Sequence, residues 1–230
     1  MKLAIMQPYF FPYAGYFKLV SEVDKFVFLD DVNYINRGWI NRNRLFLAGE
    51  VRYITVPLVG ASQNLRINDI FVQPKEVWQP KLLDVIRQSY SKAPNFSNTF
   101  ELIKHVLHAG GPEDKISDVS RRSVVETSKC LGLDTHFIET SSIYENARLK
   151  GPERIVDICL RANATEYFNL PGGEGLYEKD FFSENDLNLK FVSPALVPYS
   201  QFGRDFAPGL SIIDVLMFNS FEESRGIVLS

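Results

Sequence analysis

The chain has 230 residues, of which 45% are hydrophobic and 23% are charged; this is the composition of an ordinary globular protein and excludes a disordered, collagen-like or coiled-coil chain. Its 25 basic and 28 acidic residues give a net charge of −3, and because no run of Lys and Arg occurs, we expect no DNA binding. Cys130 and Cys159 are not spaced as a pair, and no segment approaches the ~18 apolar residues of a membrane span. These features predict a cytoplasmic protein with reduced cysteines.

The first thirty residues predict a strand, a helix and a second strand. Residues Lys2–Met6 and 25–29 are apolar runs, and residues 16–21 between them are long enough for a short helix. Two apolar strands joined through a helix are typical of a parallel crossover, in which both faces of each strand are buried. Asp30 and Asp31 close the second strand.

The middle of the chain changes from strands to helices. Residues 44–47 and 51–56 flank a short connection that contains glycine, which predicts a β-hairpin, and residues 65–72 are expected to form another strand. Apolar residues then recur every three to four positions, which predicts a helical insertion over about residues 74–132 whose last helix covers 116–131.

The remaining residues return to alternating strands and helices. We expect strands at 135–139, Glu166–Asn169 and 189–192, and helices at 152–161 and 211–218. This order predicts a single α/β domain over residues 1–230, with a three-layer, mostly parallel Rossmann-like sheet and a helical insertion in its middle.

A loop rich in aromatic residues follows the first predicted strand. The segment QPYFFPYAGY, residues 7–16, contains two prolines, one glycine and five aromatic residues. Ligands of open α/β sheets bind beyond the carboxyl ends of the strands, and a glycine lets the backbone approach a ligand at a helix start. The alternative is an aromatic plug that packs under the sheet. The ligand-binding interpretation makes candidates of Gln7, Tyr9, Tyr13, Gly15 and Tyr16.

A second loop, residues 30–44, has the sequence DDVNYINRGWINRNR. Guanidinium groups bind phosphates or carboxylates, aromatic rings stack on bases or sugars, and paired carboxylates could hold a metal, a sugar hydroxyl or an amine. The alternative is an internal network in which these arginines neutralise the two aspartates. The candidate residues in this loop are Asp30, Asp31, Tyr34, Arg37, Trp39, Asn41, Arg42 and Arg44.

A glycine-rich segment, LPGGEGL at residues 170–176, follows a predicted strand. The backbone N–H groups of Gly172 and Gly173 could cradle a phosphate. The segment matches neither of the standard glycine motifs for phosphate binding, and a plain turn is the alternative.

Near the C-terminus, Tyr199 and Gln201 are polar candidates within an aromatic and aliphatic stretch. Ser211 is expected to be the N-cap of the following helix, with Asp214 as its capping partner. None of the three histidines has carboxylates or cysteines at ligand spacing, so we expect no metal site, and no signature of a hydrolytic triad occurs.

The opening MQPYFFPYAGYFKLVSEVDKFVFLDDVNYINRGWINRNR and the tail EYFNLPGGEGLYEKDFF…LSIIDVLMFNS resemble the WbqC-like family. The likeness runs from the first residue to about Asn219. This family is associated with bacterial gene clusters for surface polysaccharide (O-antigen, lipopolysaccharide). The resemblance implies an enzyme that modifies sugars, with acylation of an amino sugar by glycine or a related amino acid as one activity. It favours a dTDP-linked sugar as substrate and makes ATP and magnesium candidate cofactors.

A second resemblance concerns Tyr13-Ala14-Gly15-Tyr16. These residues follow the first strand at the position where nucleotidyltransferases of the HIGH superfamily (the HUP fold) have H-x-G-H. Both histidines are tyrosines here, and a phenol with a pKa near ~10 supplies no cation to a transferring phosphate. The resemblance therefore implies a similar fold and leaves nucleotide binding open.

Taken with these candidate residues, the family resemblance implies transfer of an acyl or aminoacyl (glycyl) group to the amine of a nucleotide-linked deoxysugar. Arg37, Arg42 and Arg44 would bind the diphosphate or the donor carboxylate, and Asp30 or Asp31 would take the proton of the attacking ammonium. Stacking and orienting roles are expected for Tyr9, Tyr13, Trp39, Gln7 and Asn41. The alternatives are a non-catalytic sugar-nucleotide binding module and a nucleotidyltransferase. The leading hypothesis requires residues 7–16 and 30–44 to line one pocket at one edge of the sheet.

Overall fold

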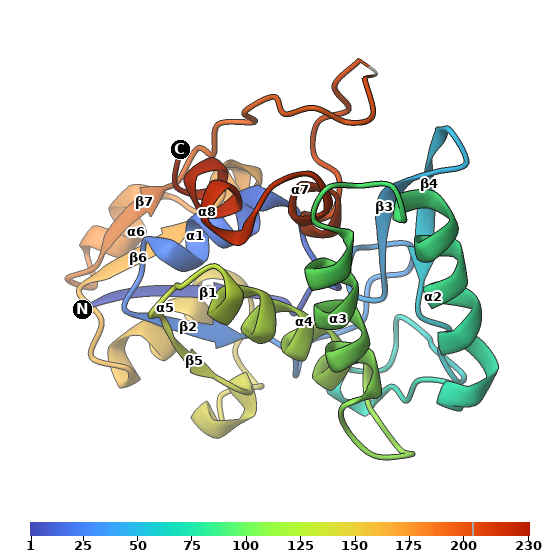
Figure 1. Ribbon diagram of the computed structural model, residues 1–230. Helices are drawn as coiled ribbons and strands as arrows, with labels where there is room; N and C mark the ends of the chain where they lie inside the picture. The colour runs from blue at the N-terminus through green and yellow to red at the C-terminus, as the bar shows by residue number, and fades with distance from the viewer. Residues whose placement is uncertain (204) are drawn as a thin grey trace.

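Five parallel strands form the central sheet of the computed structural model, which describes residues 1–203 and 205–230 (Figure 1). The order β5-β2-β1-β6-β7 corresponds, counting only these strands along the chain, to the order 3-2-1-4-5 of a Rossmann-like sheet. The strands are β1 (Lys2–Met6), β2 (Lys25–Phe28), β5 (His136–Ile138), β6 (Glu166–Asn169) and β7 (Asn188–Phe191). The predicted Rossmann-like α/β class is confirmed.

Helices cover both faces of this sheet. Helix α1 (Ala14–Ser21) connects β1 to β2, and α5 (Gly151–Arg161) connects β5 to β6. Since both crossovers are expected to be right-handed and run in opposite directions along the sheet, the two helices lie on opposite faces. Alternate residues of β1 and β2 divide accordingly between the two cores: Ala4, Phe26 and Phe28 on the α1 side, and Leu3, Ile5 and Val27 on the α5 side. The result is a three-layer structure.

A hairpin and three helices lie between β2 and β5 in the chain. Strand β3 (Arg42–Leu47) pairs with β4 (Glu50–Thr55), and α2 (Lys75–Tyr90), α3 (Phe96–His108) and α4 (Ile116–Cys130) follow. These elements extend to one side of the sheet in Figure 1. Helix α4 contacts both α3 and α1, so it links the inserted helices to the helix layer of the sheet.

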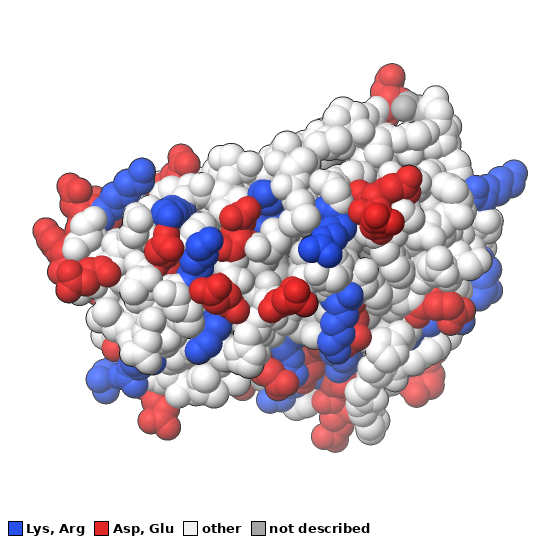
Figure 2. Space-filling view, turned by 60° about the vertical axis from the view of Figure 1, so that its left-hand side comes forward, with Lys and Arg blue, Asp and Glu red and all other residues white. Residues whose placement is uncertain are grey.

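Three α-helices follow β6 in the described part of the chain. Helix α6 (Lys179–Ser183) precedes β7, and α7 (Ile212–Phe218) and α8 (Phe221–Leu229) end the chain, where α8 contacts α1. None of the described helices combines the length and the apolar composition that crossing a bilayer requires. Figure 2 shows basic and acidic side chains interspersed over the face that it presents.

The strand expected at residues 65–72 does not form. This segment contains a short 3₁₀ helix, η1 (Ile67–Asp69), and pairs with other segments through isolated bridges alone. Its buried side chains include Ile67 and Ile70, which are three residues apart as in a 3₁₀ turn. The intervening Asn68-Asp69 favours a turn over an extended strand.

Candidate ligand-binding site

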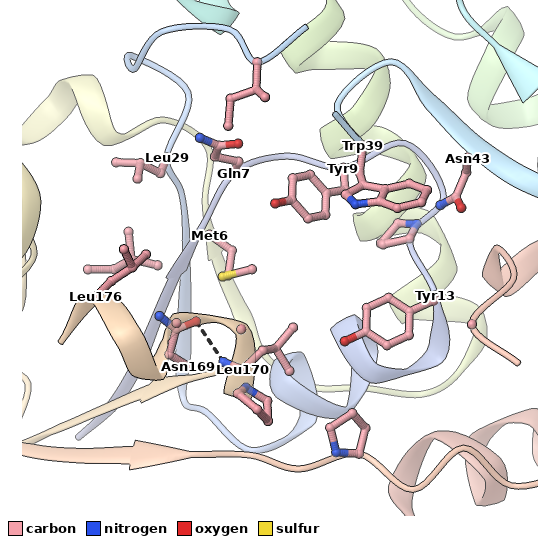
Figure 3. Close-up of a pocket in the computed structure, with 18 of the residues that line it drawn as sticks. Met6, Gln7, Tyr9, Tyr13, Leu29, Trp39, Asn43, Asn169, Leu170 and Leu176 are labelled. Atoms are coloured by element: carbon pink, nitrogen blue, oxygen red, sulfur yellow. Dashed lines mark hydrogen bonds between the residues drawn. The ribbon is translucent and has the colours of Figure 1, made fainter. Parts of the chain in front are cut away.

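A cavity of about 740 Å³ opens at the carboxyl ends of β1 and β6. The chain leaves these two neighbouring strands in opposite directions along the sheet, which makes this the topological switch point where Rossmann-like proteins bind ligands. The volume lies within the range of small-molecule sites, about 300–1,000 Å³. Its polar, aromatic and glycine lining comprises Gln7, Tyr9, Tyr13, Trp39, Asn43, Arg44, Asn169, Gly172, Gly173, Tyr177 and Gly209, and many of these are shown in Figure 3.

The aromatic loop and the arginine-bearing loop share this cavity, as the sequence hypothesis required. The backbone N–H of Phe10 donates to the carbonyl oxygen of Trp39 at 3.0 Å. The side chain of Asn43, at the start of the hairpin, donates to the carbonyl oxygens of Phe10 and Phe11 at 3.0 and 2.7 Å. Direct hydrogen bonds therefore hold the two loops together along one wall of the cavity.

Helix α4 supports both loops from behind through two serines one turn apart. Ser120 donates to the carbonyl oxygen of Ile40 at 2.6 Å, and Ser123 accepts from the backbone N–H of Phe11 at 2.8 Å. Phe11 has a φ of 39°, a left-handed conformation that is unusual for a bulky residue. Ser211 also donates to the Phe11 carbonyl oxygen, at 2.7 Å, so hydrogen bonds on both sides of this residue hold its backbone in place.

Gly15 and Tyr16 lie behind the cavity wall. A Cβ atom on Gly15 would lie 2.4 Å from the ring of Tyr13 and 2.6 Å from Pro194, so the close approach that this glycine permits is to those two side chains. Tyr16 is fully buried in the core, where its hydroxyl donates to the carbonyl oxygen of Gln7 at 2.8 Å. Tyr16 thereby fixes the backbone from which the Gln7 side chain enters the cavity.

Several polar groups that face the cavity have no partner in the described part of the protein. These are the amide of Gln7 and the hydroxyls of Tyr9 and Tyr13. Burial raises the pKa of both tyrosines, so their hydroxyls are neutral hydrogen-bond donors at physiological pH. These groups are available to a ligand.

Arg44 is the one charged side chain among the described residues of the lining. Its Nη2 donates to the carbonyl oxygen of Gly209 at 3.1 Å, while its Nε is buried and has no partner among the residues that the structure describes. The guanidinium carbon lies 5.6 Å from the ring centre of Trp39. The cavity is thus positive on the hairpin side, and none of its described lining residues is acidic, so none of them would oppose an anion.

The glycine-rich segment after β6 forms a 3₁₀ helix, η3 (Pro171–Leu176), and both candidate glycines line the cavity. A Cβ on Gly173 would lie 2.7 Å from the Asn169 side-chain nitrogen, whereas one on Gly172 would meet nothing within 4 Å. The Asn169 side chain accepts from the N–H of Leu170 at 2.8 Å. Gly173 therefore makes room for Asn169 at the end of β6.

The two candidate aspartates lie outside the cavity lining. Both Asp31 oxygens accept from Nη2 of Arg154 on α5, at 2.5 and 2.6 Å, and the side chains of this pair are 4% and 6% exposed. Asp30 accepts from the Thr140 hydroxyl at 2.7 Å and from the N–H of Ser141 at 3.2 Å, and burial raises its pKa. An internal network was one sequence-based alternative, but the cation in it is Arg154 and not one of the loop arginines.

The other candidate residues of the second loop form hydrogen bonds within that loop. Tyr34 donates to the Asn41 side chain at 2.8 Å, and both residues are buried. The Arg42 guanidinium donates to the carbonyl oxygens of Gly38, at 3.1 Å, and Arg37. None of these residues lines the cavity, and the side chain of Arg37 is exposed.

Tyr199 and Gln201 belong to a buried cluster around Asp214. The Asp214 carboxylate accepts from the hydroxyls of Tyr90 and Tyr199, both at 2.6 Å, and from the Gln201 amide at 2.7 Å. Burial raises the pKa of Asp214. Ser211 caps α7 as expected, whereas the Asp214 side chain binds this cluster and not the helix start; the backbone N–H of Ser211 donates to the carbonyl oxygen of Arg44 instead.

Sequence reasoning missed Asn43, Asn169 and Arg154. Asn169 ends a predicted strand of a parallel sheet, so the rule that ligands bind at carboxyl ends could have found it. Asn43 and Arg154 had no comparable signal, because their partners are distant in sequence. Among the described residues, no three His, Cys, Asp or Glu side chains are grouped so that they could hold a metal.

The fold and the cavity define a Rossmann-like α/β protein with a partly aromatic cavity at its switch point. The chain belongs to the WbqC-like protein family, whose model matches residues 7–226. It is 30% identical over 220 residues to "Uncharacterized protein Rv1507c" of Mycobacterium tuberculosis (strain ATCC 25618 / H37Rv), an alignment that covers 95% of this chain and 93% of that protein. No solved structure matches the chain significantly.

Proposed function

We propose that the protein transfers an acyl or aminoacyl (glycyl) group to the amine of a nucleotide-linked deoxysugar in surface-polysaccharide (O-antigen) biosynthesis. The observation that carries this proposal is the cavity at the switch point, in which Arg44, the one cation among the described lining residues, lies beside the ring of Trp39. A guanidinium group suits a diphosphate, and aromatic rings suit bases and sugars. Membership of the WbqC-like family supports the sugar-modifying activity.

The polar groups of the lining suit a sugar. Gln7 offers an amide that can donate and accept, and Tyr9 and Tyr13 offer neutral hydroxyls, because burial raises their pKa. Apolar side chains such as Met6 and Leu29 separate these groups. A ligand with a few hydroxyls on an otherwise apolar ring would satisfy such a surface.

In the proposed reaction the sugar amine attacks the carbonyl carbon of the donor. A C–N bond forms, the bond from that carbon to the donor's leaving group breaks, and the proton of the ammonium must pass to a base. Asp30 is our candidate base, because it directly follows the lining residue Leu29 and because burial raises its pKa, which strengthens it as a proton acceptor. Asp31, held by Arg154, would position Asp30.

Whether the reaction needs the candidate cofactors ATP and magnesium depends on which acyl donor the protein uses. Magnesium prefers oxygen ligands and is usually bound through carboxylates together with phosphates, and no carboxylate occurs among the described lining residues. The lining therefore does not fit a protein-held magnesium ion, and we assign no step to ATP or to the metal. A donor that is already activated, such as a charged tRNA, needs neither.

A non-catalytic sugar-nucleotide binding module is the second candidate function. The observation that favours it is that no Asp, Glu, His, Lys or Cys is among the described residues that line the cavity. Nucleotidyl transfer has no comparable support, because Tyr16, at the position of the second histidine of H-x-G-H, is buried in the core.

Mass spectrometry separates these functions. The protein is incubated with a nucleotide-linked amino sugar and either glycine with ATP or charged tRNA, and the sugar nucleotide is examined for an added acyl mass. We expect an acylated product from the wild-type protein and none from Asp30→Asn, which should still bind the sugar nucleotide. Saturable binding without product under any donor would favour the binding module and contradict the transferase.

A further inference from the structure

The outer face of the β3–β4 hairpin continues the wall of the cavity. The register of the two strands pairs Arg44 with Tyr53, so both side chains lie on the same face of the hairpin. The ring centre of Tyr53 lies 6.2 Å from that of Trp39, and Trp39 lines the cavity. Since Trp39 is 38% and Tyr53 49% exposed, two accessible rings lead out of the cavity.

Positive charge lies beside both rings. The guanidinium carbon of Arg42 is 4.2 Å from the ring centre of Tyr53, and that of Arg44 is 5.6 Å from the ring centre of Trp39. Neither arginine forms an ion pair with a carboxylate of the described residues; both donate to backbone oxygens, and Nε of Arg44 is buried without a partner. Within the described part of the chain, two cations thus lack a carboxylate partner and lie next to a cavity without an acidic lining residue, which favours an anionic ligand.

The opposite end of the cavity has different chemistry. In Figure 3, Gln7 and Asn169 lie across the cavity from Trp39, in the neighbourhood of Met6 and Leu29. The described lining residues at this end supply amide groups and apolar surface and carry no charge. A sugar nucleotide carries its diphosphate between its two ends, so once the diphosphate lies at Arg44, its base and its sugar point to opposite ends of the site.

We propose, on the basis of the function proposed above, that the sugar nucleotide binds in one orientation. The sugar lies against Gln7 and Asn169 at the edge of the sheet, and the diphosphate lies at Arg44. The base stacks on Trp39 and Tyr53, on the side of the cavity where the hairpin lies. Tyr53 is then a binding residue of a nucleoside half-site outside the cavity. Stacking tolerates any base, so this half-site contributes affinity while the amide end selects the sugar.

Calorimetric titrations with two ligands test this orientation. One ligand is a free nucleoside diphosphate (dTDP, UDP or GDP), and the other is the matching sugar nucleotide. We expect Tyr53→Ala to weaken both ligands by the same factor, at least about 5-fold, and Tyr53→Phe to retain both affinities because the ring remains. Gln7→Ala is expected to weaken the sugar nucleotide and leave the nucleoside diphosphate unchanged.

Val51→Ala provides the control, because Val51 is exposed and pairs with Phe46 on the same hairpin face farther from the cavity; all affinities should stay unchanged. If Tyr53→Ala binds nucleoside diphosphate as tightly as the wild type, or if Gln7→Ala weakens that ligand, the orientation is overturned while the proposed function stands. A wild-type protein that binds no sugar nucleotide overturns the proposed function, and the orientation that rests on it.

Discussion

Two loops leave the same edge of the sheet from the neighbouring strands β1 and β2. The polar groups of one loop are hydrogen-bonded in the interior, and those of the other face a cavity. After β2, the carboxylates of Asp30 and Asp31 are buried. Asp30 accepts hydrogen bonds from Thr140 and Ser141, and Asp31 accepts from Arg154. After β1, the side-chain amide of Gln7 and the hydroxyls of Tyr9 and Tyr13 face a cavity and have no partner in the described residues.

The difference separates structural polar groups from groups available to a ligand. Buried polar groups are almost always hydrogen-bonded within a protein, so the pair of Asp31 with Arg154 is accounted for by the fold itself, and Asp30 remains the carboxylate proposed as the base. Groups that a protein leaves unpaired around a cavity of small-molecule size are free to bind a ligand. Residue type alone would have ranked the two regions in the opposite order, because carboxylates are the more familiar catalytic groups.

The largest expected effect is a loss of folding stability when the buried ion pair of Asp31 and Arg154 is broken. Asp31→Asn leaves the Arg154 guanidinium buried without a counter-charge, and we expect the free energy of unfolding to fall by about 3–5 kcal/mol. Urea denaturation measures it. Glu50→Gln, in the exposed pair with Arg52, is the control and should change stability by less than about 1 kcal/mol. Equal effects of the two substitutions would contradict the structural role of the buried pair.

The next effect concerns ligand affinity at the cavity. Arg44→Gln removes the charge of the lining, and we expect the affinity for a sugar nucleotide to fall by about 2 kcal/mol, or ~30-fold. Isothermal titration calorimetry measures this loss. The same substitution at Arg37, which is exposed and outside the lining, should leave the affinity within about 2-fold. Matching losses at both positions would show that charge in general, and not this site, attracts the ligand.

A smaller effect is expected where α4 supports the cavity wall. Ser123→Ala leaves the backbone N–H of Phe11 without its side-chain partner, which should cost about 1–3 kcal/mol of unfolding free energy and also weaken the sugar nucleotide. Ser128→Ala on the same helix is the matched control, because the buried Ser128 hydroxyl has no hydrogen-bond partner in the described part of the chain. If both variants bind ligand like the wild type, α4 does not position the wall.

The smallest effect concerns pH. Burial raises the folded-state pKa of Asp214 above its usual value of 3.8, so the folded protein holds this proton more tightly than the unfolded chain. Stability from this group is therefore greatest at low pH and falls as the pH rises through the raised pKa; Asp30 acts in the same direction. Asp214→Asn should reduce the fall seen in urea denaturation from about pH 4 to about pH 7. If the stability of Asp214→Asn falls more steeply over this range than that of the wild type, this sign is contradicted.

Much of the fold could be predicted because its signals are local. The apolar runs around β1, β2 and β6 and the helical periodicity after residue 74 identify the elements, and their alternation identifies the sheet type. Helix α8 was missed although Ser220 and Glu223 form a capping box, with the Ser220 side chain accepting from the N–H of Glu223 at 3.2 Å. That S-x-x-E spacing is a readable signal of a helix start.

The site could be predicted less fully. Both loops that line the cavity were identified, since their composition and their place after strands are visible in the sequence. Which of their residues face the cavity depends on partners far away in the chain, such as Arg154 for Asp31 and Gly209 for Arg44. No pattern within residues 30–44 distinguishes Arg44, which lines the cavity, from Arg42, which binds its own loop.

Trp39 offers the most direct test that the unpaired groups form a ligand site. The chain has two tryptophans, and Trp78 is 6% exposed and away from the lining, so Trp78→Phe leaves Trp39 as the single tryptophan, whose emission can be excited selectively over that of the tyrosines. Titration of this variant with dTDP-, UDP- and GDP-sugars should produce a saturable change in Trp39 emission for at least one of them. An emission spectrum that stays unchanged with every sugar nucleotide would contradict the account.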